Sequence, residues 1–434
     1  MSGLNRLSAT AAARKLATRE ISAVALLEDC LERIAAREPV VHAWTFLDPE
    51  AARRRARELD AQGPAGLLHG IPIAVKDLFD TCAMPSSYGS PIYADHRPAA
   101  DASSVALARA AGAIVVGKTV TTEFATFHPG PTCNPHNPLH TPGGSSSGSA
   151  AAVADWMVPL AFGTQTAGSI VRPAAYCGVV GYKPTFGTVN RVGVKMISDT
   201  LDTIGALART VPDVALFVAA LTDRPELLIE RPLRRPPRVG LCRTQQWDHA
   251  QPETVTAFEE AARGLDKAGA SVREIVLPAQ FAELVDAQIA IMVHEVAKSL
   301  SYERLVHRDM LSVEMIAMID AGLAVSPARY DAARILAQRS RLALAQVFAD
   351  VDVLLAPSTA GEAPHGIAAT GDPLFNRMWT LLHAPCIHLP FAIGPRGLPV
   401  GITIVGPIGG DRETLLAADW IHARLAPTDS LAAA

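Results

Sequence analysis

Serine and glycine residues are concentrated in two short segments, residues 143–149 and 163–170. The apolar segment between them, residues 150–162, has to be buried, so it would hold both loops against a core and disfavours a flexible Gly/Ser linker. Two such loops can bring two hydroxyls and several free main-chain N–H groups to one point. That combination is what nucleophilic serine chemistry needs: a hydroxyl that attacks a carbonyl carbon, and N–H groups that stabilise the resulting oxyanion.

Residues 144–148 also match the formal pattern G-x-S-x-G of a nucleophile elbow. An elbow needs a strand directly before the serine and a helix after it. Residues 134–142 contain three prolines, which a central strand does not tolerate. His383 and His388 lie downstream as candidate bases, but without the strand the elbow interpretation fails.

The segment from Gly112 to Thr119 satisfies the phosphate-loop pattern G-x-x-x-x-G-K-[ST], with Lys118 at the lysine position. A phosphate loop needs a turn whose N–H groups converge on an anion. Here the interior is Ala-Ile-Val-Val, which favours a buried strand, and a predicted helix precedes it. Nucleotide binding through this segment is therefore a distant alternative.

The cysteine and histidine pattern does not predict a metal centre. Cys133, His136 and His140 are close in the sequence. However, Pro135 and Pro138 prevent the helix that would align the two histidines. The six cysteines form no C-x-x-C pair and are typical of buried thiols in a reducing compartment. We expect neither a metal nor a cofactor.

The composition describes a chain that can bury a large core. Of its 434 residues, 49% are hydrophobic and 19% are charged, and the formal net charge is −4. This charge balance lacks the excess of positive charge that is typical of proteins that bind nucleic acid or an anionic membrane. The sequence contains neither an apolar run of about 18 residues nor the pattern of a secretory signal. The cytoplasm is the expected location.

Helical periods and short β-branched runs alternate along the chain, which indicates an α/β sandwich with helices on both faces of a sheet. Proline-rich residues 231–238 are the best candidate for a linker. Residues 276–350 have helical patterns and could cap a site built elsewhere. The clearest helix patterns are residues 26–34, 51–59, 103–111, 214–221, 252–268 and 412–424, and the clearest strand patterns are residues 71–75, 113–116, 239–242, 271–275, 351–355 and 400–405.

The two serine-rich segments also carry a specific resemblance. Residues 143–154 read Gly-Gly-Ser-Ser-Ser-Gly-Ser-Ala-Ala-Ala-Val-Ala, and residues 163–170 read Gly-Thr-Gln-Thr-Ala-Gly-Ser-Ile. Together with residues 177–185, they resemble the amidase signature family, and the similarity covers essentially the whole chain. The supporting blocks are residues 69–80, 111–119, 201–205 and 397–406.

The resemblance implies an α/β/α sandwich in which helices cover both faces of a large mixed β-sheet. It implies a single domain over residues 1–434. The signature core would span about residues 65–210, and a helical, substrate-capping region would span about residues 276–390.

The family uses a Ser–cis-Ser–Lys triad, and each member has a matching position in this chain. Ser169 matches the nucleophile, Ser145 matches the bridging serine held by a cis peptide bond, and Lys76 matches the base. Lysine can take a proton from a serine only when it is neutral, so its pKa must fall from about 10.4 toward about 7–8 through desolvation. Ser145 can relay the proton because a hydroxyl both donates and accepts.

The resemblance also assigns the oxyanion hole to the main-chain N–H groups of Thr166, Ala167, Gly168 and Ser169. Ala167 and Gly168 are small, which lets a substrate carbonyl approach the main chain. One lost donor in such a hole typically costs about 3–4 kcal/mol of transition-state stabilisation.

Several positions depart from the family pattern. Gln165 stands where Asp is common, and Ala167 and Ser147 stand where glycines are common. The family arginine two places after the nucleophile is Val171 here, and Arg172 follows one place later. An Asp–Arg contact that braces the loop is therefore either absent or rebuilt. These changes leave the triad intact but alter the support of the loop and the shape of the pocket.

We therefore predict a hydrolase that cleaves an acyl C–N bond other than a peptide bond through an acyl-enzyme on Ser169. The expected partners are a small-molecule amide, ester or carbamate and a second copy of the chain, with no nucleic acid and no membrane. An alternative within the family is the glutaminase-type A subunit of a tRNA-dependent amidotransferase, which works with protein partners. An inactive binding relative is the non-enzymatic alternative.

Overall fold

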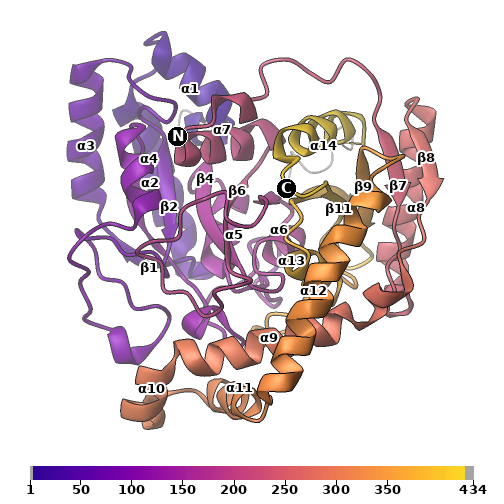
Figure 1. The fold of residues 1–434 in the computed structure, drawn as a ribbon. Helices are drawn as coiled ribbons and strands as arrows, with labels where there is room; N and C mark the ends of the chain where they lie inside the picture. The colour runs from indigo at the N-terminus through magenta and orange to yellow at the C-terminus, as the bar shows by residue number, and fades with distance from the viewer. Residues whose placement is uncertain (1–2, 426–434) are drawn as a thin grey trace.

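The computed structural model describes residues 3–425. Its centre is a mixed sheet of 11 strands in the order β1-β3-β2-β4-β6-β5-β10-β11-β9-β7-β8. Helices cover both faces of this sheet (Figure 1), which confirms the expected α/β/α sandwich. The strands are β1 (Trp44–Leu47), β2 (Pro72–Lys76), β3 (Ile114–Thr119), β4 (Leu160–Gln165), β5 (Val180–Lys183), β6 (Thr203–Ala208), β7 (Arg238–Leu241), β8 (Ser271–Glu274), β9 (Val353–Pro357), β10 (Cys386–Ile393) and β11 (Pro399–Val405).

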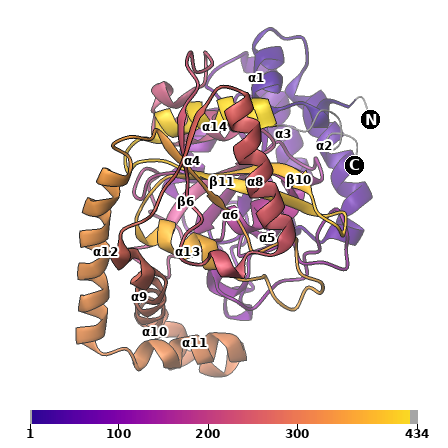
Figure 2. The same cartoon turned by 90° about the vertical axis from the view of Figure 1, so that its right-hand side faces the viewer.

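The helices form two layers. Helices α7 and α14 pack on each other and on the central strands, and helices α5 and α6 pack on the opposite face. Helices α9, α11 and α12 pack together beyond the end of the sheet, as Figure 2 shows from the side. No helix within residues 3–425 has both the length and the apolar character needed to cross a lipid bilayer. The helices are α1 (Ala9–Ala17), α2 (Ala23–Val41), α3 (Pro49–Gln62), α4 (Ser103–Ala110), α5 (Ser147–Ala154), α6 (Val171–Cys177), α7 (Val211–Thr222), α8 (Pro252–Lys267), α9 (Leu284–Ser299), α10 (Ser301–Val306), α11 (Val313–Leu323), α12 (Pro327–Val347), α13 (Leu374–Leu381) and α14 (Asp411–Leu425).

Glycines in the central strands let α6 and the residue before it lie close to the sheet. A Cβ atom on Gly181 of β5 would lie 2.6 Å from the Cβ atom of Ala174. A Cβ atom on Gly205 of β6 would lie 2.8 Å from Cδ1 of Ile170. Both distances are shorter than van der Waals contact, so glycine at these strand positions permits the close packing.

The composition of the central strands explains why the sequence pattern missed three of them. The predicted strands at residues 71–75, 113–116 and 351–355 correspond to β2, β3 and β9. Strands β4, β5 and β6 lie near the centre of the sheet, yet none has more than two β-branched residues, and each contains a glycine. A short segment with few β-branched residues gives a weak strand signal in the sequence. The glycines of β5 and β6 are needed there for the close packing of α6 and the residue before it.

Strands β2 and β4 position the candidate base. They are parallel neighbours, with Ile73 paired to Leu160, and all of their residues are buried. Because parallel strands run toward the same edge of a sheet, Lys76 at the end of β2 comes to lie beside Thr164 near the end of β4.

The segment from Gly112 to Thr119 is not a phosphate loop, because most of it forms the buried strand β3. Lys118 is buried on this strand, and its Nζ atom lies 2.8 Å from Oδ1 of Asp77. It also donates a hydrogen bond to the carbonyl of Phe79 at 2.8 Å. Its amine is therefore occupied by the protein, and the nucleotide-binding alternative has no site here.

We expect Lys118→Met to lower the free energy of unfolding by about 3–5 kcal/mol, because the variant leaves the Asp77 carboxylate buried without its partner. Urea unfolding at neutral pH measures the change. The double variant Asp77→Asn/Lys118→Met removes both charges and should recover part of the loss. If Lys118→Met were as stable as the wild type, the pair would not be the buried ion pair described above.

Candidate active site

Lys76 is a fully buried lysine whose amine contacts hydroxyl groups. Its Nζ atom lies 2.7 Å from Oγ of Ser145, 2.7 Å from Oγ1 of Thr164 and 3.0 Å from Oγ of Ser146. Within residues 3–425, no carboxylate forms an ion pair with it. A neutral amine satisfies this environment, because it donates two N–H groups and accepts one hydroxyl proton on its lone pair.

Burial lowers the pKa of Lys76 well below its ordinary value of 10.5. The cause is desolvation, which disfavours the charged form of an amine. The negative charge of Asp202 acts in the opposite direction and offsets only part of the effect. The amine is therefore biased toward the neutral form that can accept a proton.

Ser145 is fully buried in the loop before α5, and the peptide bond between Gly144 and Ser145 is cis. Arg172 binds this loop: its Nη2 and Nε atoms donate to the carbonyl of Gly144 at 2.7 Å and 3.1 Å. Its Nη1 atom donates to the carbonyl of Gly371. The arginine that stands one place later than in the family pattern therefore supports the first serine loop.

The loop from Thr166 to Ser169 joins the end of β4 to the start of α6. In the described part of the chain, none of its four main-chain N–H groups donates a hydrogen bond. Buried main-chain N–H groups are almost always paired, so four consecutive unpaired groups are unusual. Successive main-chain N–H groups of this kind form a concavity that binds anions.

Ser169 lies at the end of this loop and is 6% exposed. Its hydroxyl makes no hydrogen bond with any residue that the structure describes, and none joins it to Ser145. Of the three residues that the sequence matched to the triad, the structure thus joins Lys76 to Ser145 directly and leaves the hydroxyl of Ser169 unpaired.

Gln165 supports the loop where the family commonly has Asp. Its Oε1 atom accepts hydrogen bonds from the N–H groups of Ile170 at 2.9 Å and Val171 at 3.0 Å. Its Nε2 atom donates to Oγ1 of Thr380 at 2.9 Å. The Asp–Arg contact of the family pattern is therefore replaced by two separate sets of hydrogen bonds. Gln165 holds the second serine loop, and Arg172 holds the first.

Asp202 belongs to this site, although the sequence analysis did not predict a contact for it. Its carboxylate accepts hydrogen bonds from Oγ1 of Thr166 and from the N–H group of Ile197, the latter at 2.8 Å. Burial raises its pKa to about 6. The only sign of Asp202 in the sequence was its position in residues 201–205, one of the segments that support the family resemblance.

Two further contacts to the loop come from distant helices. Gln288 of α9 donates from Nε2 to the carbonyl of Thr166 at 3.0 Å. Thr380 of α13 donates from Oγ1 to the carbonyl of Ala167 at 2.7 Å. Gln288 and Thr166 are 122 residues apart in the chain, so no local pattern connects them.

The histidines that the sequence patterns singled out lie outside this cluster. His136 and His140 bond to main-chain carbonyls at 2.9 Å and 2.8 Å, and His383 bonds to another carbonyl at 2.8 Å. His388 bonds to Oγ of Ser358 at 2.7 Å, and burial lowers its pKa to about 3. No described contact joins any of them to either serine loop.

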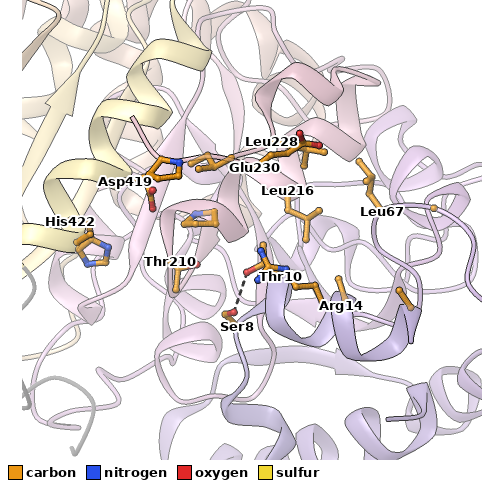
Figure 3. Close-up of a pocket in the computed structure, with 17 residues that line it drawn as sticks. Ser8, Thr10, Arg14, Leu67, Thr210, Leu216, Leu228, Glu230, Asp419 and His422 are labelled. Carbon is orange, nitrogen blue, oxygen red and sulfur yellow. Dashed lines mark hydrogen bonds between the residues drawn. The ribbon is translucent and has the colours of Figure 1, made fainter. Parts of the chain in front are cut away.

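A cavity of about 740 Å³ opens among α1, α7 and α14 (Figure 3). Because α7 and α14 lie on the sheet face opposite α6, this cavity is remote from the loop that α6 continues. We therefore assign no acyl-transfer chemistry to it. The labelled side chains that line it include Ser8, Thr10, Arg14, Thr210, Asp419 and His422.

The sequence profile of the family described as Amidase matches residues 25–415. The chain belongs to this family. The A subunit of the glutamyl-tRNA(Gln) amidotransferase of Acidothermus cellulolyticus is 35% identical over an alignment of 470 positions, gaps included, which covers 95% of this chain and 93% of that protein. This membership supports an enzyme that acts on carbon–nitrogen bonds.

Solved structures of amidases share the fold. One described as an amidase is 31% identical, has a TM-score of 0.89, and the match covers 97% of this chain and 100% of that one. The peptide amidase of Stenotrophomonas maltophilia is 30% identical with a TM-score of 0.79, and the match covers 96% of each chain.

The sequence predicted that the partners are a small-molecule substrate and no nucleic acid. The relatives in this family contradict that prediction. The relatives from Acidothermus cellulolyticus and Roseiflexus castenholzii match at least 95% of this chain. Both are named as one subunit of an enzyme whose name includes a charged tRNA. The expectation was wrong because the net charge of one chain does not report the nucleic-acid contacts that partner subunits can provide.

Proposed function

We propose that this amidase-family chain is the amide-cleaving A subunit of an amidotransferase, in which Ser169 forms the acyl-enzyme, Ser145 relays protons and Lys76 is the base. The observation that carries the proposal is a buried amine bonded to hydroxyls beside a loop with four unpaired N–H groups. The relatives named as amidotransferase subunits, at 33% to 35% identity, support the place of the chain in such an assembly.

Acylation begins with neutral Lys76. Lys76 accepts the proton of Ser145 while Ser145 accepts the proton of Ser169, whose Oγ atom bonds to the carbonyl carbon of the amide. This step requires Oγ of Ser169 to come within hydrogen-bond distance of Oγ of Ser145, and catalytic hydrogen bonds commonly tighten in this way when substrate binds. The N–H groups of residues 166–169 stabilise the negative charge that develops on the carbonyl oxygen.

The tetrahedral intermediate then collapses with rupture of the C–N bond. The leaving nitrogen takes the proton that Lys76 holds, through Ser145, and departs as ammonia or an amine. A water molecule attacks the remaining ester, and its proton moves through Ser145 to Lys76. When the ester bond breaks, that proton returns to Ser169, so Lys76 is neutral again at the end of the cycle.

Ammonia release from L-glutamine tests the proposed function. The assay compares the chain alone with the chain mixed with the other subunits of the Acidothermus cellulolyticus amidotransferase. We expect release in the mixture to exceed that of the chain alone by about tenfold or more, a typical coupling between sites. The proposal would be contradicted by an absence of ammonia in both samples together with a Ser169 that a fluorophosphonate does not label.

A further inference from the structure

A cavity of about 700 Å³ lies where helices α9 and α12, which pack on each other (Figure 1), meet the segment between β5 and β6. Its volume is in the range of pockets that hold small organic ligands. Lys76 does not line it, and neither serine loop contributes a residue to its wall. The cavity is therefore distinct from the site of acyl transfer.

Three arginines line this cavity. Arg334 and Arg341 come from α12, and Arg191 comes from the segment between β5 and β6. None of the carboxylates in residues 3–425 forms an ion pair with any of the three; their contacts are with main-chain carbonyls and rings. Three guanidinium groups around one cavity without a paired carboxylate are an arrangement that an anion can complete.

Two of these guanidinium groups are held in place while part of each stays unused. Arg191 donates from Nη1 to the carbonyls of Asp199 at 3.0 Å and Asp202 at 3.2 Å. Its Nε and Nη2 atoms, which form one edge of the fork, bond to no described residue. Arg341 donates from Nε and Nη2 to the carbonyl of Leu381, and its Nη1 atom is free within the described chain. The bound donors fix both groups and leave the others for a ligand.

The third guanidinium group is the most accessible. Arg334 is exposed, and its Cζ atom lies 5.5 Å from the centroid of the Tyr330 ring. This contact with the ring needs none of the N–H donors of Arg334. The positive charge of Arg334 also acts on Arg341, whose pKa falls to about 10, mainly through burial and then through this repulsion. The two cations thus share the cavity wall.

The other titratable groups at the cavity place negative charge toward solvent. Asp199 and Asp331 line it as well, and both are exposed. His383 is neutral at neutral pH, because burial and the nearby cations lower its pKa to about 3. Lys183 and Asp202 lie behind the wall, where burial lowers the pKa of the lysine and raises that of the aspartate to about 6. Burial therefore moves both of these groups toward their neutral forms.

This arrangement selects among anions. The wall carries three positive and two negative charges, and the half-buried Arg191 and Arg341 are screened less by solvent than the exposed aspartates. A carboxylate has two oxygens and is satisfied by one fork, whereas a phosphate monoester presents three terminal oxygens that several forks can share. The exposed aspartates repel an extended polyanion such as an RNA backbone more than one compact phosphate group.

We propose that this cavity binds the phosphate group of a small organic phosphate, held by Arg191, Arg334 and Arg341. The site is separate from Ser169, and the inference does not depend on the proposed amide cleavage.

Calorimetry with the full chain at low ionic strength tests the site. We expect ribose 5-phosphate to bind and ribose, which lacks the phosphate group, not to bind. Inorganic phosphate should compete with ribose 5-phosphate. Arg334→Met should raise the Kd about tenfold through the loss of charge-assisted hydrogen bonds, and Arg334→Lys should raise it about threefold, because lysine keeps the charge without the fork.

Asp331→Asn gives the opposite sign. It removes a negative charge from the wall without removing a donor, so the Kd should fall about threefold, the effect of one exposed charge. A general disturbance of α12 would weaken binding in both variants. Opposite shifts in Arg334→Met and Asp331→Asn therefore distinguish direct charge recognition from a structural role.

Arg339→Met is the matched control, because Arg339 is an exposed arginine of α12 that does not line the cavity. Its Kd should stay within about twofold of the wild type, and so should that of Ser169→Ala. The inference is wrong if neither inorganic phosphate nor ribose 5-phosphate binds, or if binding is the same in Arg334→Met. Tighter binding of a short oligouridylate without terminal phosphates would also overturn it, because RNA would then be the ligand.

Discussion

Ser169→Ala is expected to lower kcat/KM for amide cleavage by about 10⁴-fold or more, because it removes the atom that bonds to the acyl group. Ser145→Ala keeps this nucleophile but interrupts the path to Lys76, so we expect a loss of about 10²- to 10⁴-fold. Initial rates of ammonia release measure both effects. Circular dichroism confirms that the variants are folded.

Ser149→Ala is the matched control for these two variants. Ser149 is buried in the first turn of α5, four residues after Ser145, but it bonds to Oγ1 of Thr119 at 2.7 Å rather than to Lys76. We expect its kcat/KM to stay within about threefold of the wild type.

A fluorophosphonate identifies the nucleophile directly. Mass spectrometry should locate the adduct on Ser169 in the wild type and in Ser149→Ala, and no adduct should form in Ser169→Ala. An adduct on Ser145 would show that the nucleophile and the relay have been exchanged.

Lys76→Met is expected to cost about 10³-fold or more in kcat, with a much smaller change in KM. Methionine fills a similar volume but has no lone pair of sufficient basicity to take the proton of Ser145. The expected loss is therefore in the chemical step rather than in binding. Rates of ammonia release as a function of amide concentration separate the two parameters.

The pH dependence of kcat/KM tests whether Lys76 acts as the base. Only neutral Lys76 accepts a proton, and burial places its pKa below 10.5. In the wild type, kcat/KM should rise with pH through the pKa of Lys76 and level off above it. In Lys76→Met, that rise should disappear.

Lys183→Met is the matched control, because Lys183 is also fully buried and burial also lowers its pKa. Its Nζ atom bonds to the carbonyl of Pro184 at 3.1 Å, and its variant should retain the rise. A rise that persists in Lys76→Met would assign the titration to another group and remove Lys76 as the base.

The two serine loops could be located from the sequence because their signal is local. Glycine and serine in residues 143–149 and 163–170 flank a segment that must be buried, and this order of residue types does not depend on distant packing. The buried strand within residues 112–119 was predictable for the same reason, since its β-branched run is continuous. The alternation of helix and strand patterns was sufficient for the fold class.

The support of the site was decided by tertiary structure. The carbonyls of Thr166 and Ala167 and the Nε2 atom of Gln165 bond to side chains of helices α9 and α13, more than 100 residues later in the chain. Hydrophobic periodicity shows which face of a helix is buried but not which loop lies against it. Such contacts depend on how the helices pack around the sheet, and no spacing within the sequence encodes that arrangement.

The sequence by itself therefore determined the chemistry-bearing side chains, the loops that carry them and the layered fold. Tertiary structure alone decided that Lys76 is removed from solvent and that Arg172 and Gln165 each support one of the two serine loops. The physical reason is that residue type is a local property, whereas desolvation and charge balance depend on every group that the fold packs around an atom.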